Sequence, residues 1–189
     1  MSLEARLETI VRASPTLMTV LEGLRDLDFP QWRLVSGAVY QTVWNDLTGR
    51  APDHGLRDYD AMYFDPDTTW DAEDAFIRTA AAAFPEPLSQ MVEVRNQARV
   101  HLWFEGKFGE PYAPLTCTDE AVERFLAPAF AVGVRLEKGG RLDILAPFGL
   151  EDCFAMRLRP NPRRLVNDRN LPKVAGKLMT RWPELTLEL

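Results

Sequence analysis

Residues 36–65 read SGAVYQTVWNDLTGRAPDHGLRDYDAMYFD, and this stretch decides the fold that the chain is expected to adopt. It holds a Ser36-Gly37 pair, a segment with apolar residues at helical spacing, and two acids, Asp58 and Asp60, that run into apolar residues. Side chains alternate between the faces of a strand, so the two acids are expected to share one face. Adjacent carboxylates repel each other unless a cation lies between them, which points to a divalent metal and a phosphate-bearing substrate.

The composition is that of an ordinary globular protein. The chain has 189 residues, of which 46% are apolar and 26% charged, and its formal net charge is −6. We expect one domain over residues 1–189, because this length suits a single core. The acidic balance does not favour nonspecific nucleic-acid binding, and no apolar run is long enough for a signal peptide or a membrane span. The expected protein is therefore cytoplasmic, with no membrane association and no indicated nucleic-acid binding.

Helical and strand patterns alternate along the chain. We expect N-terminal helices in residues 1–30 with a break at Ser14-Pro15, the core motifs in residues 31–104, and a C-terminal hairpin and helices in residues 105–189. The expected helices cover residues 38–49, 72–84, 116–126, 149–157 and 171–182. The expected strands cover residues 32–35, 58–64, 91–104, 131–136 and 142–146, and we expect the strand over residues 91–104 to bend near Asn96-Gln97. The Gly-Gly pair between the last two strands predicts a tight hairpin. This mixture predicts an α+β fold in which helices flank a mixed β-sheet.

The Ser36-Gly37 pair stands where a helix is expected to begin. A glycine at a helix N-terminus lets backbone N–H groups approach a phosphate closely. Serine is also a common helix cap, so two interpretations are open: the pair caps the helix, or it holds phosphates.

Taken together, the Ser36-Gly37 pair and the Asp58/Asp60 pair resemble the nucleotidyltransferase superfamily, typified by DNA polymerase beta. The longer pattern, over residues 15–185, is similar to a family of uncharacterised bacterial nucleotidyltransferase-like proteins. The segments that carry this resemblance are SG at 36–37, VW at 43–44, DYD at 58–60, YFD at 63–65, NQARVH at 96–101, APFGLED at 146–152 and RPNP at 159–162.

The resemblance implies a nucleotidyltransferase-like fold and transfer of a nucleoside monophosphate from an NTP to an acceptor, either a small molecule or a macromolecule. Mg²⁺ or Mn²⁺ would be the cofactor, Asp58 and Asp60 its catalytic ligands, and Ser36 and Gly37 the residues that hold the terminal phosphates. One alternative is a nucleotide-binding or regulatory domain of the same fold without catalysis. Another is a scaffold or antitoxin-like protein whose acidic face binds a partner.

Active members of the superfamily usually carry a third carboxylate on a neighbouring strand, as metal ligand or general base. The middle of the expected strand 91–104 has no acid on its odd-numbered face, which carries Arg95, Gln97, Arg99 and His101. Glu93 lies at one end of this strand. His101 either acts as the base or packs as a structural histidine. Arg99 either binds phosphate or pairs with an acid.

Two further features leave alternatives open. Asn96 and Gln97 are costly to bury without partners, so each either holds the local structure or faces a ligand. The acidic chain also has one basic segment, with Arg157, Arg159, Arg163, Arg164, Arg169 and Lys173. This segment is either a solvated face or a weak site for a phosphorylated acceptor, because no aromatic residues alternate with the cations.

Overall fold

The structure, a computed structural model, describes residues 1–164 and 170–189. Arg169 of the basic segment lies outside the described residues. The strands are β1 (Arg33–Val35), β2 (Tyr59–Tyr63), β3 (Val92–Asn96), β4 (Gly133–Leu136), β5 (Leu142–Leu145), β6 (Arg157–Leu158) and β7 (Thr186–Leu187). The α-helices are α1 (Leu3–Arg12), α2 (Pro15–Leu27), α3 (Gly37–Leu47), α4 (Trp70–Ala83), α5 (Leu88–Met91), α6 (Phe104–Phe108), α7 (Thr118–Val122), α8 (Glu151–Phe154) and α9 (Asn170–Met179). Two 3₁₀ helices are η1 (Gln97–Leu102) and η2 (Pro128–Phe130).

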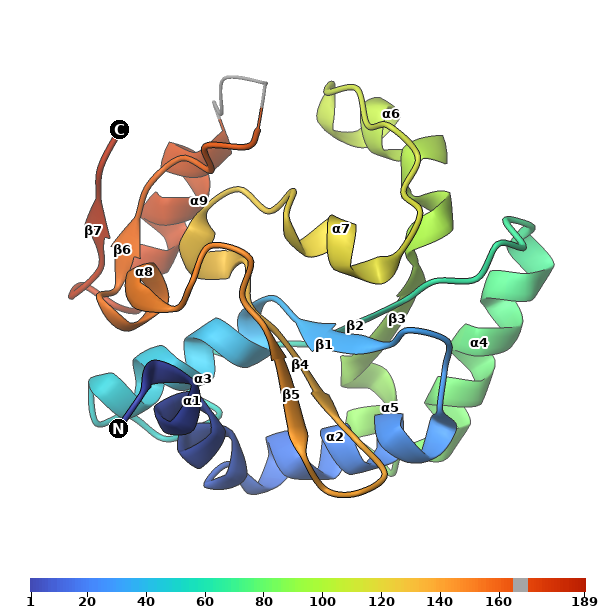
Figure 1. Ribbon diagram of the computed structural model, residues 1–189, viewed down its shortest axis with the longest axis horizontal. Coiled ribbons are helices and arrows are strands. Elements are labelled where there is room, and N and C mark those ends of the chain that lie inside the picture. The colour runs from blue at the N-terminus through green and yellow to red at the C-terminus, as the bar shows by residue number, and fades with distance from the viewer. Residues whose placement is uncertain (165–169) are drawn as a thin grey trace.

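The centre of the fold is a five-stranded sheet in the order β3-β2-β1-β4-β5 (Figure 1). Strands β2 and β3 are parallel, whereas the other neighbours are antiparallel. The expected α+β class with a mixed sheet is therefore confirmed. The hairpin is also confirmed: β4 and β5 pair in register, and Gly140 adopts φ +80° at the turn, where glycine has no steric penalty. Strands β6 and β7 form a separate parallel pair.

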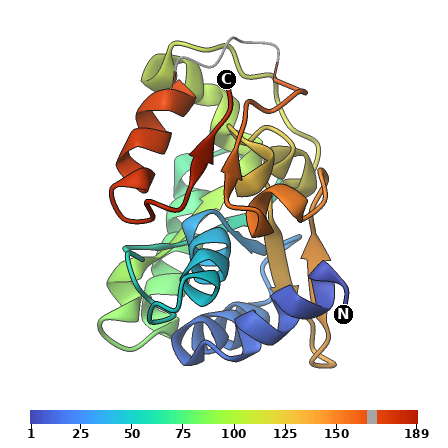
Figure 2. The same cartoon turned by 90° about the vertical axis from the view of Figure 1, so that its left-hand side faces the viewer.

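One face of the sheet is buried against the first helices. Four paired residues form a row across β3, β2, β1 and β4, namely Val94, Ala61, Leu34 and Val134. All four belong to the main hydrophobic core. Pro15 begins α2 as expected, because its fixed φ suits a first turn. In Figures 1 and 2, α1 and α2 lie below the sheet, while α6 and α9 stand above it.

The opposite face of the sheet is only partly covered. Here Val35 packs on Val122 of α7 and on Ala131, in a small cluster of its own. Beyond this cluster the same face lines a cavity together with residues of α6, α7 and α9, and Asp60 of β2 and Glu93 and Arg95 of β3 lie on it. None of the described helices is both long and apolar enough to cross a membrane.

The expected strand region over residues 91–104, bent near Asn96-Gln97, is a strand only as far as that bend, and its second half is wrong. Strand β3 ends at Asn96, because the side-chain Oδ1 of Asn96 accepts a hydrogen bond from the backbone N–H of Ala98 (3.1 Å) and turns the chain into η1. The expected helix over residues 116–126 is limited to α7, after which the chain continues in tight turns. The expected helix over residues 149–157 is limited to α8, because Met156 adopts φ +51°.

Candidate active site

Asp60 lies near the start of β2, on the open face of the sheet. It pairs with Val35 of β1 on one side and with Glu93 of β3 on the other, so one row of the sheet places Val35, Asp60 and Glu93 side by side. Asp60 and Glu93 line a cavity of about 680 Å³ whose walls come from β2, β3, η1, α6, α7 and α9. A cavity of this size accommodates a ligand of the size of a nucleotide.

The Ser36-Gly37 turn joins β1 to α3 beside Asp60. Ser36 has φ +64° and ψ −145°, a conformation that only glycine adopts without strain. Its side chain makes no helix-capping hydrogen bond; instead, the hydroxyl donates to the carboxylate of Asp60. Of the two interpretations of this turn, the structure therefore does not support a serine cap. The strained backbone holds the serine hydroxyl next to the acid, at the residue before α3, a helix whose first N–H groups have no partner within the helix itself.

The electrostatic environment of Asp60 is unfavourable for its charged form. Burial and then the negative charge of Asp58 raise the pKa of Asp60 from 3.8 to about 6, against a smaller effect of the Ser36 hydrogen bond. Glu93 acts in the same direction as Asp58, and Arg95 opposes it. A partly buried carboxylate with two acidic neighbours is the arrangement that a bound cation stabilises.

Asp58 lies at the edge of the site rather than inside it. It immediately precedes β2, is exposed, and is not among the residues that line the cavity. Its charge nevertheless acts on both Asp60 and Tyr40. Tyr40, on α3, lines the cavity, and its pKa is raised to about 12, mainly by burial. The charge of Asp58 thus acts on Asp60, but of these two acids Asp60 alone lines the cavity.

Glu93 is a carboxylate on the strand next to that of Asp60, where the sequence indicated no acid in the middle of the expected strand. The expected strand placed Arg95 to His101 at its centre, whereas the parallel register of β2 and β3 sets Glu93 directly beside Asp60. Glu93 is about half exposed and contacts only Arg95, at 3.4 Å, among the charged side chains described. Both side chains line the cavity, so a carboxylate and a guanidinium lie next to Asp60.

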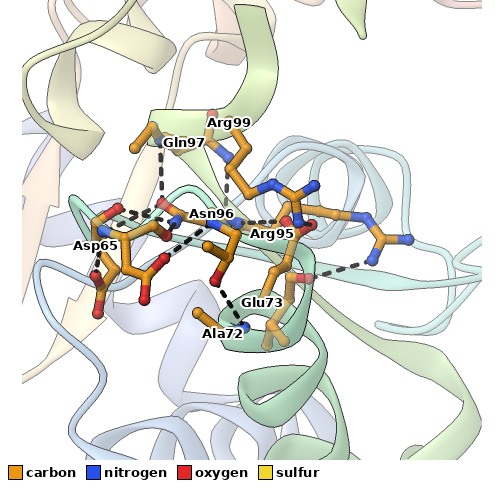
Figure 3. A network of polar contacts seen from close by, with 11 residues as sticks. Asp65, Ala72, Glu73, Arg95, Asn96, Gln97 and Arg99 are labelled. Carbon is orange, nitrogen blue, oxygen red and sulfur yellow. Dashed lines mark hydrogen bonds and ion pairs between the residues drawn. The ribbon is translucent and has the colours of Figure 1, made fainter. Parts of the chain in front are cut away.

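Asn96 has a structural role. Its side-chain Nδ2 donates to the carbonyl oxygens of Asp65 (2.9 Å) and Asp67 (3.2 Å), and its Oδ1 accepts from the N–H of Asp65 (3.0 Å). Its own N–H donates to Oε1 of Glu73 (3.0 Å), so Asn96 lies at the centre of the network in Figure 3. These bonds join the end of β3 to the loop that follows β2. Gln97, by contrast, lines the cavity.

Arg99 and His101 are not brought to the carboxylates. Arg99 forms an ion pair with Glu73 of α4 (2.6 Å) and lies over the ring of Trp70 (5.2 Å), as part of the same network (Figure 3). His101 is half-buried and does not line the cavity, and its Nδ1 has no hydrogen-bond partner in the described part of the chain. Both positions follow from the change of β3 into η1, because residues 97–102 form a 3₁₀ helix and their side chains no longer alternate between the two faces of the sheet.

Helix α9 forms a cationic wall of the cavity. Lys173, Val174 and Lys177 lie on one face of this helix and line the cavity. Both lysines are exposed, and neither forms an ion pair with another side chain that the structure describes. Within residues 1–164 and 170–189, Lys173 is a cation of the basic segment that lines the cavity without an acidic partner.

The donor set suits a hard divalent cation. Among residues 1–164 and 170–189, no group of three or more His, Cys, Asp or Glu side chains is arranged to hold a metal ion. Mg²⁺ does not require such a group, because it is usually bound by one or two carboxylates, water and substrate phosphates. Asp60, with its raised pKa, and the exposed Asp58, whose charge acts on Asp60, fit this mode of binding.

Comparisons with known proteins agree with this geometry. A family model described as Nucleotidyltransferase matches residues 22–187. A solved structure described by the words "The NMR structure of the protein reveals a CCA-adding enzyme head domain" is 26% identical, with a TM-score of 0.77. The match covers 96% of this chain and 95% of that chain. No curated protein matches the sequence.

Proposed function

Since the chain belongs to the nucleotidyltransferase family, whose model covers residues 22–187, we propose that it transfers a nucleoside monophosphate from an NTP to an acceptor hydroxyl. One observation carries the proposal: the strained Ser36 turn, Asp60 and Glu93 follow one another across a sheet face that opens into a cavity. A phosphate-holding turn, a metal-binding acid and a second acid are the groups that nucleotidyl transfer requires.

Asp58 and Asp60 would hold a divalent cation, Mg²⁺ or Mn²⁺, together with the phosphates of the NTP. When bound, this cation neutralises the triphosphate and makes the attacked phosphorus more electrophilic. The hydroxyl of Ser36 and the first N–H groups of α3, beginning at Gly37, bind the terminal phosphates. Lys173 of α9, which has no acidic partner among the residues that the structure describes, balances the remaining charge.

Glu93 takes the role of general base that the sequence suggested for His101. The acceptor hydroxyl forms a new O–P bond at the α-phosphorus, its proton passes to Glu93, and the bond between the α-phosphorus and the bridging oxygen breaks. Pyrophosphate leaves on the side of the Ser36 turn. Because Glu93 lies within the row of Asp60, this acid favours an enzyme over a nucleotide-binding domain without catalysis.

Transfer can be tested with labelled NTPs in a cell extract, because the extract supplies the acceptor. We expect that wild-type protein with Mg²⁺ moves the label from an α-³²P-labelled NTP into a product and releases the γ-³²P label as pyrophosphate. The Asp60→Asn variant should do neither. The proposed reaction would be contradicted if the wild-type protein consumed no NTP, or if it transferred the γ-phosphate to the acceptor instead of the nucleoside monophosphate. The expected cytoplasmic location stays a prediction.

A further inference from the structure

The apolar side chains that this protein exposes are concentrated beside the cavity. Apart from the two chain ends, four large apolar side chains of the described residues are exposed, and three of them, Leu102, Trp103 and Phe108, lie in or next to α6. Trp103 and Phe108 also line the cavity, although 39% and 46% of their surfaces are exposed. Exposed rings that line a cavity are typical of a binding surface rather than a core.

Cations lie over these rings. Nζ of Lys107 is 5.4 Å from the ring centre of Trp103 and 5.3 Å from that of Phe108. Phe104 contacts both Phe108 (4.7 Å) and Tyr112 (4.4 Å), and all these side chains line the cavity. We call Trp103, Phe104, Lys107, Phe108 and Tyr112 the α6 lobe. Rings interleaved with cations stack on nucleobases and attract the phosphates attached to them.

The α6 lobe and the Ser36 turn lie on opposite sides of Asp60. Strand β1 is antiparallel to β2, so Ser36 follows the residue that pairs with Asp60, at the start of β2. Strand β3 flanks β2 on the other side and runs parallel to it, so η1 and α6 continue from the far end of β2. In Figure 1, α3 and α9 accordingly lie to the left of α7, and α6 lies to its right.

This placement assigns the lobe to one of the two substrates. In phosphoryl and nucleotidyl transfer, the attacking and leaving oxygens lie roughly in line on opposite sides of the phosphorus. If the pyrophosphate leaves along the Ser36 turn, the acceptor approaches from the side of Glu93 and α6. The cavity continues from Asp60 to the lobe along Arg95 and Gln97, which both line it.

Resting on the proposed function, we propose that the α6 lobe is the acceptor site and that the acceptor carries a nucleotide unit, with its base stacked on the lobe. Lys107 and Arg124, which lies 4.6 Å over the ring of Tyr112, would contact its phosphate. These cations at the rings suit an anionic, planar ligand better than the apolar surface of a protein partner. The nucleotide is either free or the 3′ end of a single strand.

The acceptor site can be tested by direct binding without catalysis. The probes are a 5′-fluorescein single-stranded RNA hexamer with a free 3′ hydroxyl, and AMP as its competitor. The variants Trp103→Leu and Phe108→Leu remove lobe rings. Trp70→Leu is the matched control, because Trp70 is 60% exposed and has a cation over its ring but does not line the cavity. Wild-type protein should bind the hexamer, and each lobe variant should weaken binding about 5- to 150-fold.

A second measurement separates this proposal from the function on which it rests. Stabilisation by NTP and Mg²⁺ in a thermal shift should be equal in wild type, both lobe variants and Trp70→Leu. Displacement of the hexamer by AMP supports a free nucleotide acceptor, and its absence supports a strand end. The acceptor site is refuted if wild-type protein does not bind the hexamer, if the lobe variants bind the hexamer as wild type does, or if they lose NTP stabilisation instead. If NTP with Mg²⁺ fails to stabilise any form, the proposed function fails, whatever the hexamer does.

Discussion

Asp60→Asn should stabilise the metal-free protein at neutral pH. The folded state raises the pKa of Asp60 from 3.8 to about 6, so the folded state binds a proton more tightly than the unfolded state does. Stability therefore falls as pH rises through this window. At 1.36 kcal/mol per pKa unit, the full effect is about 3 kcal/mol. Asparagine keeps the shape and can still accept the Ser36 hydrogen bond, but it carries no charge.

The assay is thermal unfolding of both proteins from pH 3.5 to pH 8 in the presence of a chelator. The two melting temperatures should agree near pH 3.5 and separate between about pH 4 and pH 6. Above pH 7 the variant should melt about 6–12 °C higher, because 1 kcal/mol corresponds to about 2–4 °C for a chain of this length. A variant that is less stable than wild type at pH 8, or a difference that does not change with pH, would refute the reasoning.

Three further predictions follow from named contacts. Ser36→Gly relieves a strained φ of +64° and should raise the free energy of unfolding by about 1 kcal/mol in chemical denaturation. The same variant should bind NTP more weakly, because it lacks the hydroxyl. A lower free energy of unfolding than that of wild type would contradict the interpretation that this backbone is strained. Glu93→Gln should lower kcat about 10²- to 10⁴-fold with unchanged NTP affinity, whereas the exposed control Glu105→Gln should keep wild-type kcat in the same label-transfer assay. Asn45 is fully buried, accepts a hydrogen bond from Nε1 of Trp182 (2.9 Å) and donates to two backbone carbonyls. Asn45→Ala should therefore lower the free energy of unfolding in urea by at least about 3 kcal/mol. A decrease of less than about 1 kcal/mol would contradict this prediction.

The elements that local patterns specify could be predicted from the sequence. The break at Ser14-Pro15, the hairpin at its Gly-Gly turn and the strand of Asp60 depend on residues close together in the chain. The fold class followed from these patterns. Element ends were less accessible: β3 stops at Asn96 because its side chain bonds to a loop about thirty residues earlier, a contact that strand alternation does not reveal.

The parts of the candidate site that depend on pairing between distant segments could not be predicted. The position of Glu93 beside Asp60 is fixed by the register of two parallel strands, and the sequence between them does not encode that register locally. The sequence also suggested that no aromatic residues accompany the basic segment. The fold brings Trp103 and Lys173, about seventy residues apart, to walls of one cavity. Only the tertiary structure relates these two segments.

The most direct test of the account is a calorimetric titration of each NTP into wild-type protein, Asp58→Asn and Asp60→Asn, with Mg²⁺ and with a chelator. If the two aspartates hold a cation that is shared with the triphosphate, wild-type protein binds at least one NTP only when Mg²⁺ is present, and both variants lose this binding. Binding of equal strength in all three proteins, or binding that persists unchanged in the chelator, would contradict the central claim.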